Sequence, residues 1–213
     1  MGTFLSAVLV GVILVNFLIL GSSRMRGVIQ AAGLQGLLLG LALIFANPHF
    51  ERSLIVVAIL TMSIKGVIMP VLLLRAMREV SIRREVEPLI GYIASLLLGA
   101  AGTGLALIWA HGLAVGLSTA ENLVLAASFS TILSGFIVLV TRRKAITQVV
   151  GYLVLENGIF IFGLLLIGAM PTFVELGVLL DLLVGIFTMG IIINHIQRAF
   201  DSLDTTRLSA LRE

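Results

Sequence analysis

Residues 146–168 read ITQVVGYLVLENGIFIFGLLLIG, a run of mostly apolar side chains with one charged residue, Glu156, near its centre. An α-helix needs about 20 residues to cross the hydrocarbon core of a bilayer. The run is too long for a buried helix of a soluble domain, and it lacks the period-2 alternation of a barrel strand. It therefore predicts a transmembrane helix that carries a carboxylate near the membrane midplane.

Apolar runs of similar length recur along the whole chain of 213 residues, of which 59% are apolar and 12% charged, with a mean hydropathy of +1.17. Soluble domains carry about 25% charged residues, so the composition excludes a soluble protein and predicts an all-α integral membrane protein. No basic region precedes the first run, so we expect a retained span and not a cleaved signal peptide. The seven predicted spans are 3–21, 27–46, 53–74, 89–110, 122–140, 146–168 and 172–195.

The basic residues between the spans predict the orientation in the membrane. Twelve of the 14 Lys and Arg residues follow spans 1, 3, 5 and 7, whereas Arg52 lies on the other side and Lys65 lies within the third span. Because cytoplasmic loops carry an excess of Lys and Arg, we expect the N-terminus outside and the C-terminus in the cytoplasm. The twelve residues are Arg24, Arg26, Arg75, Arg78, Arg83, Arg84, Arg142, Arg143, Lys144, Arg198, Arg207 and Arg212.

A short internal repeat predicts two related modules. Residues 24–33 (RMRGVIQAAG) and 142–151 (RRKAITQVVG) share an Arg, a Gln and a Gly at matching positions. Both segments enter a helix that runs outward from the cytoplasm, so we expect two three-helix modules in parallel. The predicted parts are a first module at 1–88 with a cytoplasmic loop at 75–88, a connecting helix and outer loop at 89–121, a second module at 122–200 and a cytoplasmic tail at 201–213.

Three ionisable residues lie inside the predicted spans: Lys65, Glu156 and Asp181. Each lies about 13–15 Å from one end of its helix, near the midplane. A charge there costs about 2.5–3.5 kcal/mol, so we expect these residues to pair or to serve a function. An acid and an amine in a dry bundle can exchange a proton, whereas a static pair would only fix the packing. The sequence leaves both readings open, and also which acid meets Lys65.

Small residues and a proline near these charges predict close packing and a break in the third span. Pro70 leaves the carbonyl of Gly66 without its helical hydrogen bond, next to Lys65, which predicts a kink there. Gly36 and Gly40 have the spacing of closely packed helices. A kinked helix beside a buried charge can also hold water.

Three further polar residues are candidates for a proton path toward the cytoplasm. Gln148 and Asn157 lie on the helix of Glu156, and His195 lies at the cytoplasmic end of the last span. An interhelical hydrogen bond explains the first two equally well, and solvation explains the histidine. The sequence has no phosphate-binding loop, nucleophile elbow or HExxH motif, so we expect no catalytic residue and no metal site.

Several of these segments resemble component E of hydrogenase-4-type membrane complexes, which are relatives of formate hydrogenlyase. The resembling runs are GYLVLENG (151–158), VELGVLLDLLVGI (174–186), the ending DSLDTTRLSALRE (201–213) and IKGVIMP (64–70).

The last three helices are also similar to the K subunit of respiratory complex I and the C subunit of multisubunit sodium/proton antiporters. That small subunit carries an acid in its second helix and another in its third, and these match Glu156 and Asp181. The chain departs from the family at position 181, where Asp is one methylene shorter than Glu. Lys65 has no counterpart in the K subunit.

The resemblance implies a membrane-arm subunit of an energy-converting redox complex in the prokaryotic cytoplasmic (inner) membrane. Such a subunit is not itself catalytic and transfers protons through Glu156, Asp181 and Lys65. The implied partners are antiporter-like membrane subunits and a soluble hydrogenase-like arm with iron–sulfur clusters and a nickel–iron centre. Because this chain has no cysteine, thiolate-bound clusters must lie in those partners and we expect no cofactor here.

Two alternatives remain at this point: a structural scaffold with static ion pairs, and a free-standing ion transporter. The odd number of spans and the lack of an inverted repeat argue against the transporter. The resemblance leaves open whether the redox module is a hydrogenase, a formate-linked complex or a non-hydrogenase relative, and whether the ion is H⁺ or Na⁺.

Overall fold

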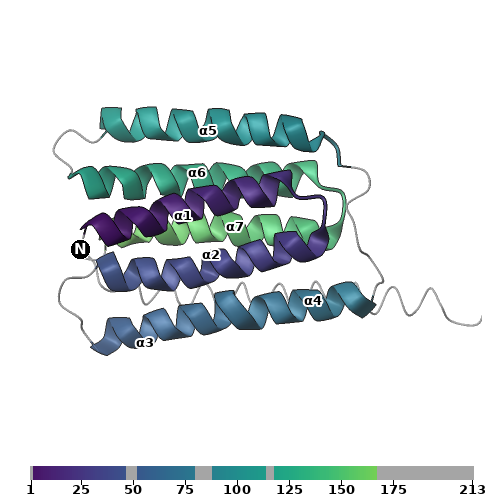
Figure 1. The fold of residues 1–213 in the computed structure, drawn as a ribbon, viewed down its shortest axis with the longest axis horizontal. Helices are drawn as coiled ribbons and strands as arrows, with labels where there is room; N and C mark the ends of the chain where they lie inside the picture. Colours follow the sequence, from purple (N-terminus) through teal and green to yellow (C-terminus); the bar gives the residue numbers. More distant parts are fainter. Residues whose placement is uncertain (1, 47–51, 80–87, 114–117, 167–213) are drawn as a thin grey trace, which may run out of the picture.

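The computed structural model describes residues 2–46, 52–79, 88–113 and 118–166 (Figure 1). Within these ranges the regular structure is helical throughout, and six helices are long and apolar enough to cross a membrane. The prediction of an all-helical membrane protein is therefore confirmed for this part of the chain. The seventh predicted span, 172–195, lies outside the described residues.

The helices follow the predicted spans to within a few residues. The largest shifts are at two helix ends: α4 ends at Glu79 and not at 74, and α7 ends at Gly163 and not at 168. Helix α6 begins at Thr119 and not at 122, because Ser118 and Glu121 form a capping box. Ser118 N donates to Glu121 Oε2 at 2.7 Å, and Glu121 N donates to Ser118 Oγ at 3.4 Å. The elements are α1 (Gly2–Gly21), α2 (Met25–Ala46), α3 (Arg52–Thr61), the π-helix η1 (Met62–Ile68), α4 (Met69–Glu79), α5 (Tyr92–Leu113), α6 (Thr119–Thr141), α7 (Ala145–Gly163) and the 3₁₀ turn η2 (Leu164–Leu166).

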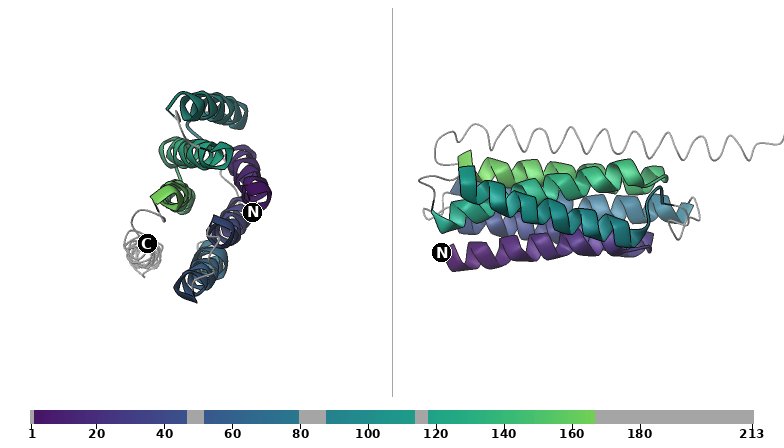
Figure 2. Two further views of the ribbon diagram at one scale, coloured as in Figure 1. Left: turned by 90° about the vertical axis from the view of Figure 1, so that its left-hand side faces the viewer. Right: turned by 90° about the horizontal axis from the view of Figure 1, so that it is seen from above.

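Four helices, α1, α2, α6 and α7, form the centre of the bundle, with α6 against α7, α1 against α2 and α6, and α2 against α7. Helix α5 packs on α6 and α1 at one flank (Figure 1). The third span, which runs from α3 through η1 to α4, packs on α2 at the opposite flank (Figure 2). The third span therefore reaches the centre of the bundle mainly across α2.

The α1–α2 turn, the α6–α7 turn, the end of α4 and the start of α5 lie at one end of the bundle (Figure 1). A backbone hydrogen bond of 2.8 Å from Leu89 N to Thr141 O joins two of these segments. We call this the basic end, because its turns and helix ends carry seven of the twelve basic residues counted above. They are Arg24, Arg26, Arg75, Arg78, Arg142, Arg143 and Lys144. That the basic end faces the cytoplasm remains a prediction from the charge pattern.

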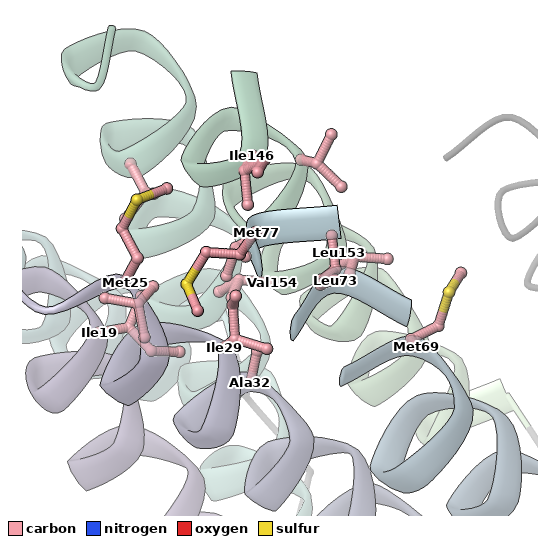
Figure 3. Packing of buried hydrophobic residues seen from close by; sticks show 14 of the residues in the cluster. Ile19, Met25, Ile29, Ala32, Met69, Leu73, Met77, Ile146, Leu153 and Val154 are labelled. Carbon is pink, nitrogen blue, oxygen red and sulfur yellow. The ribbon is translucent and has the colours of Figure 1, made fainter. Parts of the chain in front are cut away.

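Near the basic end, α1, α2, α4 and α7 meet in an apolar cluster (Figure 3). Its largest side chains, such as Met25, Ile29 and Leu73, are almost completely buried. These residues lie in the half of the bundle nearer the basic end. Other members of the cluster are Ile19, Ala32, Met69, Met77, Ile146, Leu153 and Val154.

Glycines allow two pairs of helices to approach closely. A Cβ on Gly36 of α2 would lie 2.6 Å from the carbonyl carbon of Lys65, and one on Gly40 would collide with Met62. A Cβ on Gly151 of α7 would lie 2.6 Å from the backbone nitrogen of Leu139 on α6. The prediction that Gly36 and Gly40 serve close packing is confirmed, and their partner is the third span.

Candidate proton-transfer site

The third span changes from α-helical to π-helical geometry around Lys65, which lies in the middle of η1. The N–H of Met69 donates to the carbonyl of Ile64, five residues earlier. The sequence predicted a kink at Pro70; the structure has a widened π-helical segment immediately before it. Pro70 has no N–H with which to continue the regular hydrogen-bond pattern, so this segment accommodates the proline. Short π-helical segments occur frequently at functional sites.

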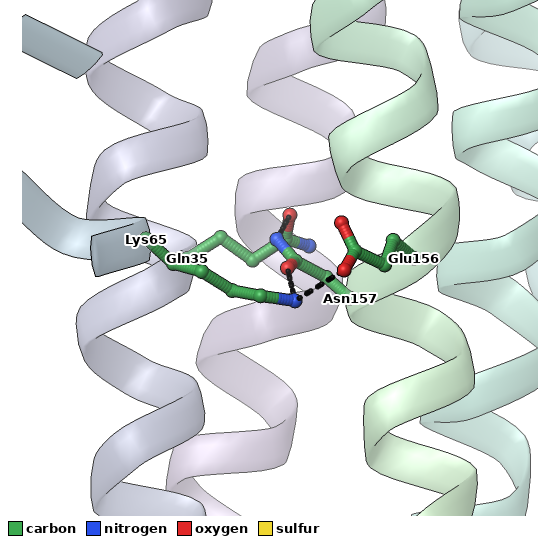
Figure 4. A network of polar contacts seen from close by, with 4 residues as sticks. All are labelled: Gln35, Lys65, Glu156 and Asn157. Atoms are coloured by element: carbon green, nitrogen blue, oxygen red, sulfur yellow. Dashed lines mark hydrogen bonds and ion pairs between the residues drawn. The ribbon is translucent and has the colours of Figure 1, made fainter. Parts of the chain in front are cut away.

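Lys65 forms a buried ion pair with Glu156 of α7 (Figure 4). Lys65 Nζ lies 3.6 Å from Glu156 Oε1, and the two side chains are 4% and 5% exposed. The same ammonium donates to Asn157 Oδ1 at 3.0 Å and lies 5.5 Å from the centre of the Phe160 ring. Of the two acids that the sequence left open as partners, the structure places Glu156 at Lys65. Asp181 lies outside the described residues.

A row of hydrogen-bonded amide side chains continues from the ion pair across the bundle. Asn157 Nδ2 donates to Gln35 Oε1 at 3.1 Å, and Gln35 Nε2 donates to Asn16 Oδ1 at 2.8 Å. Asn16 Nδ2 then donates to Thr131 Oγ1 at 3.0 Å. All of these residues are buried. We call Asn157, Gln35 and Asn16 the amide row; with Lys65 and Thr131 it connects five of the six spans described.

Three members of this network, Gln35, Asn16 and Thr131, were not predicted from the sequence, since the predicted residues were the three charges and polar residues on the spans of Glu156 and Asp181. A signal was present, since Asn16 is the one amide side chain in the largely apolar run 3–21. An amide in the membrane interior must find hydrogen-bond partners within the protein. Such residues deep in apolar spans therefore mark polar contacts as clearly as charges do.

A small pocket adjoins the ion pair on the side of the basic end. Lys65 and Asn157 line it together with apolar residues of α2, α4 and α7. It has room for about one water molecule, and a buried water needs polar partners of the kind that these two side chains offer. The remaining lining residues are Ile29, Ala32, Met69, Pro70, Leu73 and Leu153.

Gln148, which was also predicted for a path toward the cytoplasm, does not contact the ion pair in the structure. Gln148 Nε2 donates to the carbonyl of Arg142 at 2.9 Å, so this side chain braces the α6–α7 turn and faces away from the ion pair. Arg142 itself is only 2% exposed, and its Nη2 donates to the carbonyl of Leu20 at the end of α1 at 2.8 Å. From the sequence, Arg142 was predicted as a topology signal and as part of the internal repeat; the structure adds a buried contact to α1. His195 lies outside the described residues.

The geometry around Lys65 and Glu156 suits the exchange of a proton. Moving a proton from the ammonium to the carboxylate breaks an N–H bond, forms an O–H bond and converts two buried charges into two neutral groups. The separation of 3.6 Å is longer than a direct hydrogen bond, so transfer requires a small approach or one bridging water. No group of three or more metal-ligating side chains occurs among the described residues.

Comparisons with known proteins relate almost the whole chain to one curated protein and a shorter part of it to others. The chain is 31% identical over 206 residues to "Uncharacterized protein Rv0085" of Mycobacterium tuberculosis, covering 95% of this chain and 93% of that protein. It is 26% identical over 148 residues to hydrogenase-4 component E of Escherichia coli K12 and of Shigella flexneri, covering 70% of this chain and 68% of each relative. No family model and no solved structure matches. With its six apolar helices and its likeness to a hydrogenase-4 component, the chain is a multi-pass membrane protein of a multisubunit complex. It belongs to the same family as the mycobacterial protein and is a distant homologue of hydrogenase-4 component E.

Proposed function

We propose that this protein is a membrane-arm subunit of a hydrogenase-4-like, complex I-related redox complex and that it carries part of a proton path. The observation that carries the proposal is the ion pair of Lys65 and Glu156, buried where the third span becomes π-helical. A charged pair at that depth costs free energy relative to apolar packing. A function in proton transfer explains why this cost is tolerated. A proton can move from Lys65 to Glu156 without changing the net charge of the pair.

In the proposed cycle, Glu156 and Lys65 share a proton that enters through the pocket beside Lys65. Redox chemistry elsewhere in the complex changes the charge near the pair, which favours either the two ions or the two neutral groups. Asp181 is the proposed next acid on the path, on the strength of the complex I resemblance. His195 is proposed as an entry residue at the cytoplasmic end of the same segment.

The proposed partners follow from the distant homology to a hydrogenase-4 component. We propose that antiporter-like subunits neighbour this chain in the prokaryotic inner membrane and that a soluble hydrogenase-like arm carries iron–sulfur clusters and a nickel–iron centre. This chain has no cysteine, so electrons must pass through those partners. Residues 122–200 form the proposed K-subunit-like module within this arrangement.

A second candidate function is a scaffold in which the ion pair is static. One observation favours it: Asn157 donates to Gln35 and accepts from Lys65, so the ammonium is held from a second side. The two functions predict different results for the double variant Lys65→Met with Glu156→Gln, which removes both charges. The scaffold predicts normal proton movement in this variant, whereas the proton path predicts a loss.

The first experiment isolates the native assembly. A mild-detergent pull-down of the tagged chain from its own membranes, followed by mass spectrometry, should recover antiporter-like subunits and a cysteine-rich soluble arm. If the chain purifies alone, the proposal of a complex is overturned. The cofactors of the recovered arm then identify the electron donor for the next experiment.

The second experiment measures proton movement per electron with a trapped pH dye in liposomes that contain the purified complex. Glu156→Gln should assemble normally and lower this ratio, because the acid no longer accepts a proton. Glu121→Gln is the matched control: the same chemical change, at a carboxylate that caps α6 far from the pair, in a capping box that also accepts Gln. An unchanged ratio in assembled Glu156→Gln would remove Glu156 from the path.

A further inference from the structure

We infer that the amide row of Asn157, Gln35 and Asn16 positions Lys65 for its partner acid and blocks proton flow toward α1 and α6. This inference rests on the proposed proton-path function and assigns positioning residues to it. It concerns side chains that lie up to three hydrogen bonds away from the ion pair.

The direction of every hydrogen bond in the row is fixed. A lysine ammonium can only donate, so Asn157 must turn its carbonyl oxygen toward Lys65 and its NH₂ group toward Gln35. Gln35 must then present its own oxygen to Asn157 and its NH₂ group to Asn16. Each amide orientation is thus set by the one before it.

The far end of the row has the same direction. Thr131 Oγ1 donates its proton to the carbonyl of Ala127, one turn earlier in α6, at 2.7 Å. The Thr131 hydroxyl oxygen therefore accepts the hydrogen bond from Asn16 Nδ2. A donor faces an acceptor at this end of the row as well. Both ends require the same orientation, so flipping any single amide would break two hydrogen bonds inside the membrane.

The amide oxygens all point toward the Lys65 end of the row. Aligned dipoles with their negative ends toward Nζ favour a positive charge at that atom, and hydrogen bonds in such a chain strengthen one another in a low-dielectric interior. The row also fixes the place of the ammonium, whose flexible four-carbon stem would otherwise leave it mobile. Lys65 is therefore held 3.6 Å from Glu156 Oε1 by residues that contact neither atom of the pair except through Asn157.

The row cannot itself conduct protons. Amide side chains neither release their N–H protons nor accept protons near neutral pH, in contrast to carboxylates and imidazoles. A proton at Lys65 therefore has Glu156 as its acceptor on one side and no acceptor along Gln35 and Asn16. The row thus directs exchange between Lys65, Glu156 and the adjoining pocket.

The test uses the whole purified complex in liposomes and three variants, of which Thr131→Val and Thr131→Ser form a matched pair. Gln35→Met removes the centre of the row at similar volume, and Thr131→Val removes its far acceptor, whereas Thr131→Ser keeps the hydroxyl. We expect Gln35→Met to lower proton movement per electron about tenfold. Thr131→Val should lower it less, about threefold, and Thr131→Ser should restore the normal value.

A spectroscopic measurement distinguishes a change in the position of Lys65 from a general loss of protein stability. The infrared band that disappears in Glu156→Gln belongs to the Glu156 carboxyl group, and its frequency reports the distance and direction of Lys65. We expect this band to move in Gln35→Met and in Thr131→Val and to stay in place in Thr131→Ser. Ser134→Ala, a buried hydroxyl deletion one turn along α6 from Thr131, is the control for lost polarity and should leave the band unchanged.

Failure of this inference differs from failure of the proposed function. If Glu156→Gln lowers proton movement but Gln35→Met and Thr131→Val change neither the ratio nor the band, only the positioning role is overturned. If Glu156→Gln also has no effect, the proton path itself is overturned. If Gln35→Met does not assemble, the comparison of Thr131→Val with Thr131→Ser decides the positioning role alone.

Discussion

Two glycine-mediated helix contacts in this bundle have opposite characters. Between α6 and α7, a Cβ on Gly135 or on Gly151 would meet backbone atoms of the facing regular helix. Between α2 and η1, Gly36 faces the backbone of Lys65, in a segment that has left α-helical geometry. Glycine thus allows close packing of two regular helices at the α6–α7 contact, and close packing beside a buried lysine at the α2–η1 contact.

The difference follows from what must be packed. Apolar burial does not drive helices together in lipid, so close backbone packing and polar contacts must do so. The α6–α7 contact uses close packing almost alone, with a hydroxyl of Ser128 bonded to the carbonyl of Gly158 at 2.9 Å. The α2–η1 contact has to place a long lysine side chain as well. Variants at the two contacts should therefore separate stability from proton movement.

The largest expected effect is at the charged contact. Lys65→Met removes the cation but leaves Glu156 buried, which should destabilise the protein by about 3–5 kcal/mol. The loss is measured by heating the detergent-solubilised complex and recording the fraction that remains assembled at each temperature. Adding Glu156→Gln should recover most of the stability, because no charge is then stranded. Equal stability of Lys65→Met and the unmodified protein would contradict the buried pair.

The next largest effect is at the α6–α7 contact. The Cβ of Gly151→Ala would lie 2.6 Å from Leu139 N and 3.0 Å from Gly135 O. Both are backbone atoms, so the helices must separate, at a cost of about 2–3 kcal/mol. The same heating assay should show this loss, while the proton ratio of the complexes that remain assembled stays normal. A lowered proton ratio without lost stability would show that this contact is not purely structural.

The smallest effect sharpens the comparison. In Gly66→Ala of η1, the new Cβ would meet the Cδ2 and Cγ atoms of Leu37, which can move aside, so we expect a loss of about 1 kcal/mol or less. The control is Gly104→Ala in α5, where nothing lies within 4 Å of the new atom. It should be neutral or stabilising by about 0.5–1 kcal/mol. A larger loss for Gly66→Ala than for Gly151→Ala would contradict the expectation that a side-chain neighbour moves aside more easily than a backbone neighbour.

The turns at residues 24 and 142 show that residues matched by the internal repeat differ in burial and in contacts. Both begin the repeated pattern, yet Arg24 is exposed and Arg142 is buried against the end of α1. Gln30 is likewise exposed, whereas Gln148 bonds to the α6–α7 turn. The glycines at 33 and 151 both mediate close packing, but against different neighbours. A local pattern specifies a turn and a small residue, and the neighbouring helices specify their environment.

The helices and the two central charges could be predicted from the sequence, because membrane spans are set by length and hydropathy alone. The amide row could not, since Asn16, Gln35 and Asn157 come from three helices whose rotations depend on packing. Which acid meets Lys65 was undetermined for the same reason. Pro70 predicted a break in the third span, but only the structure shows that the helix becomes π-helical there, where it packs against α2.

The sequence by itself determined that this is a helical membrane protein, where its described spans lie and that Lys65 and Glu156 stand deep within them, because each of these properties is local to one helix. The tertiary structure alone decided that Lys65 pairs with Glu156, that its helix is π-helical there and that a directional amide row holds it. Those properties depend on side chains from several helices, whose mutual rotation and depth are fixed only when the bundle packs.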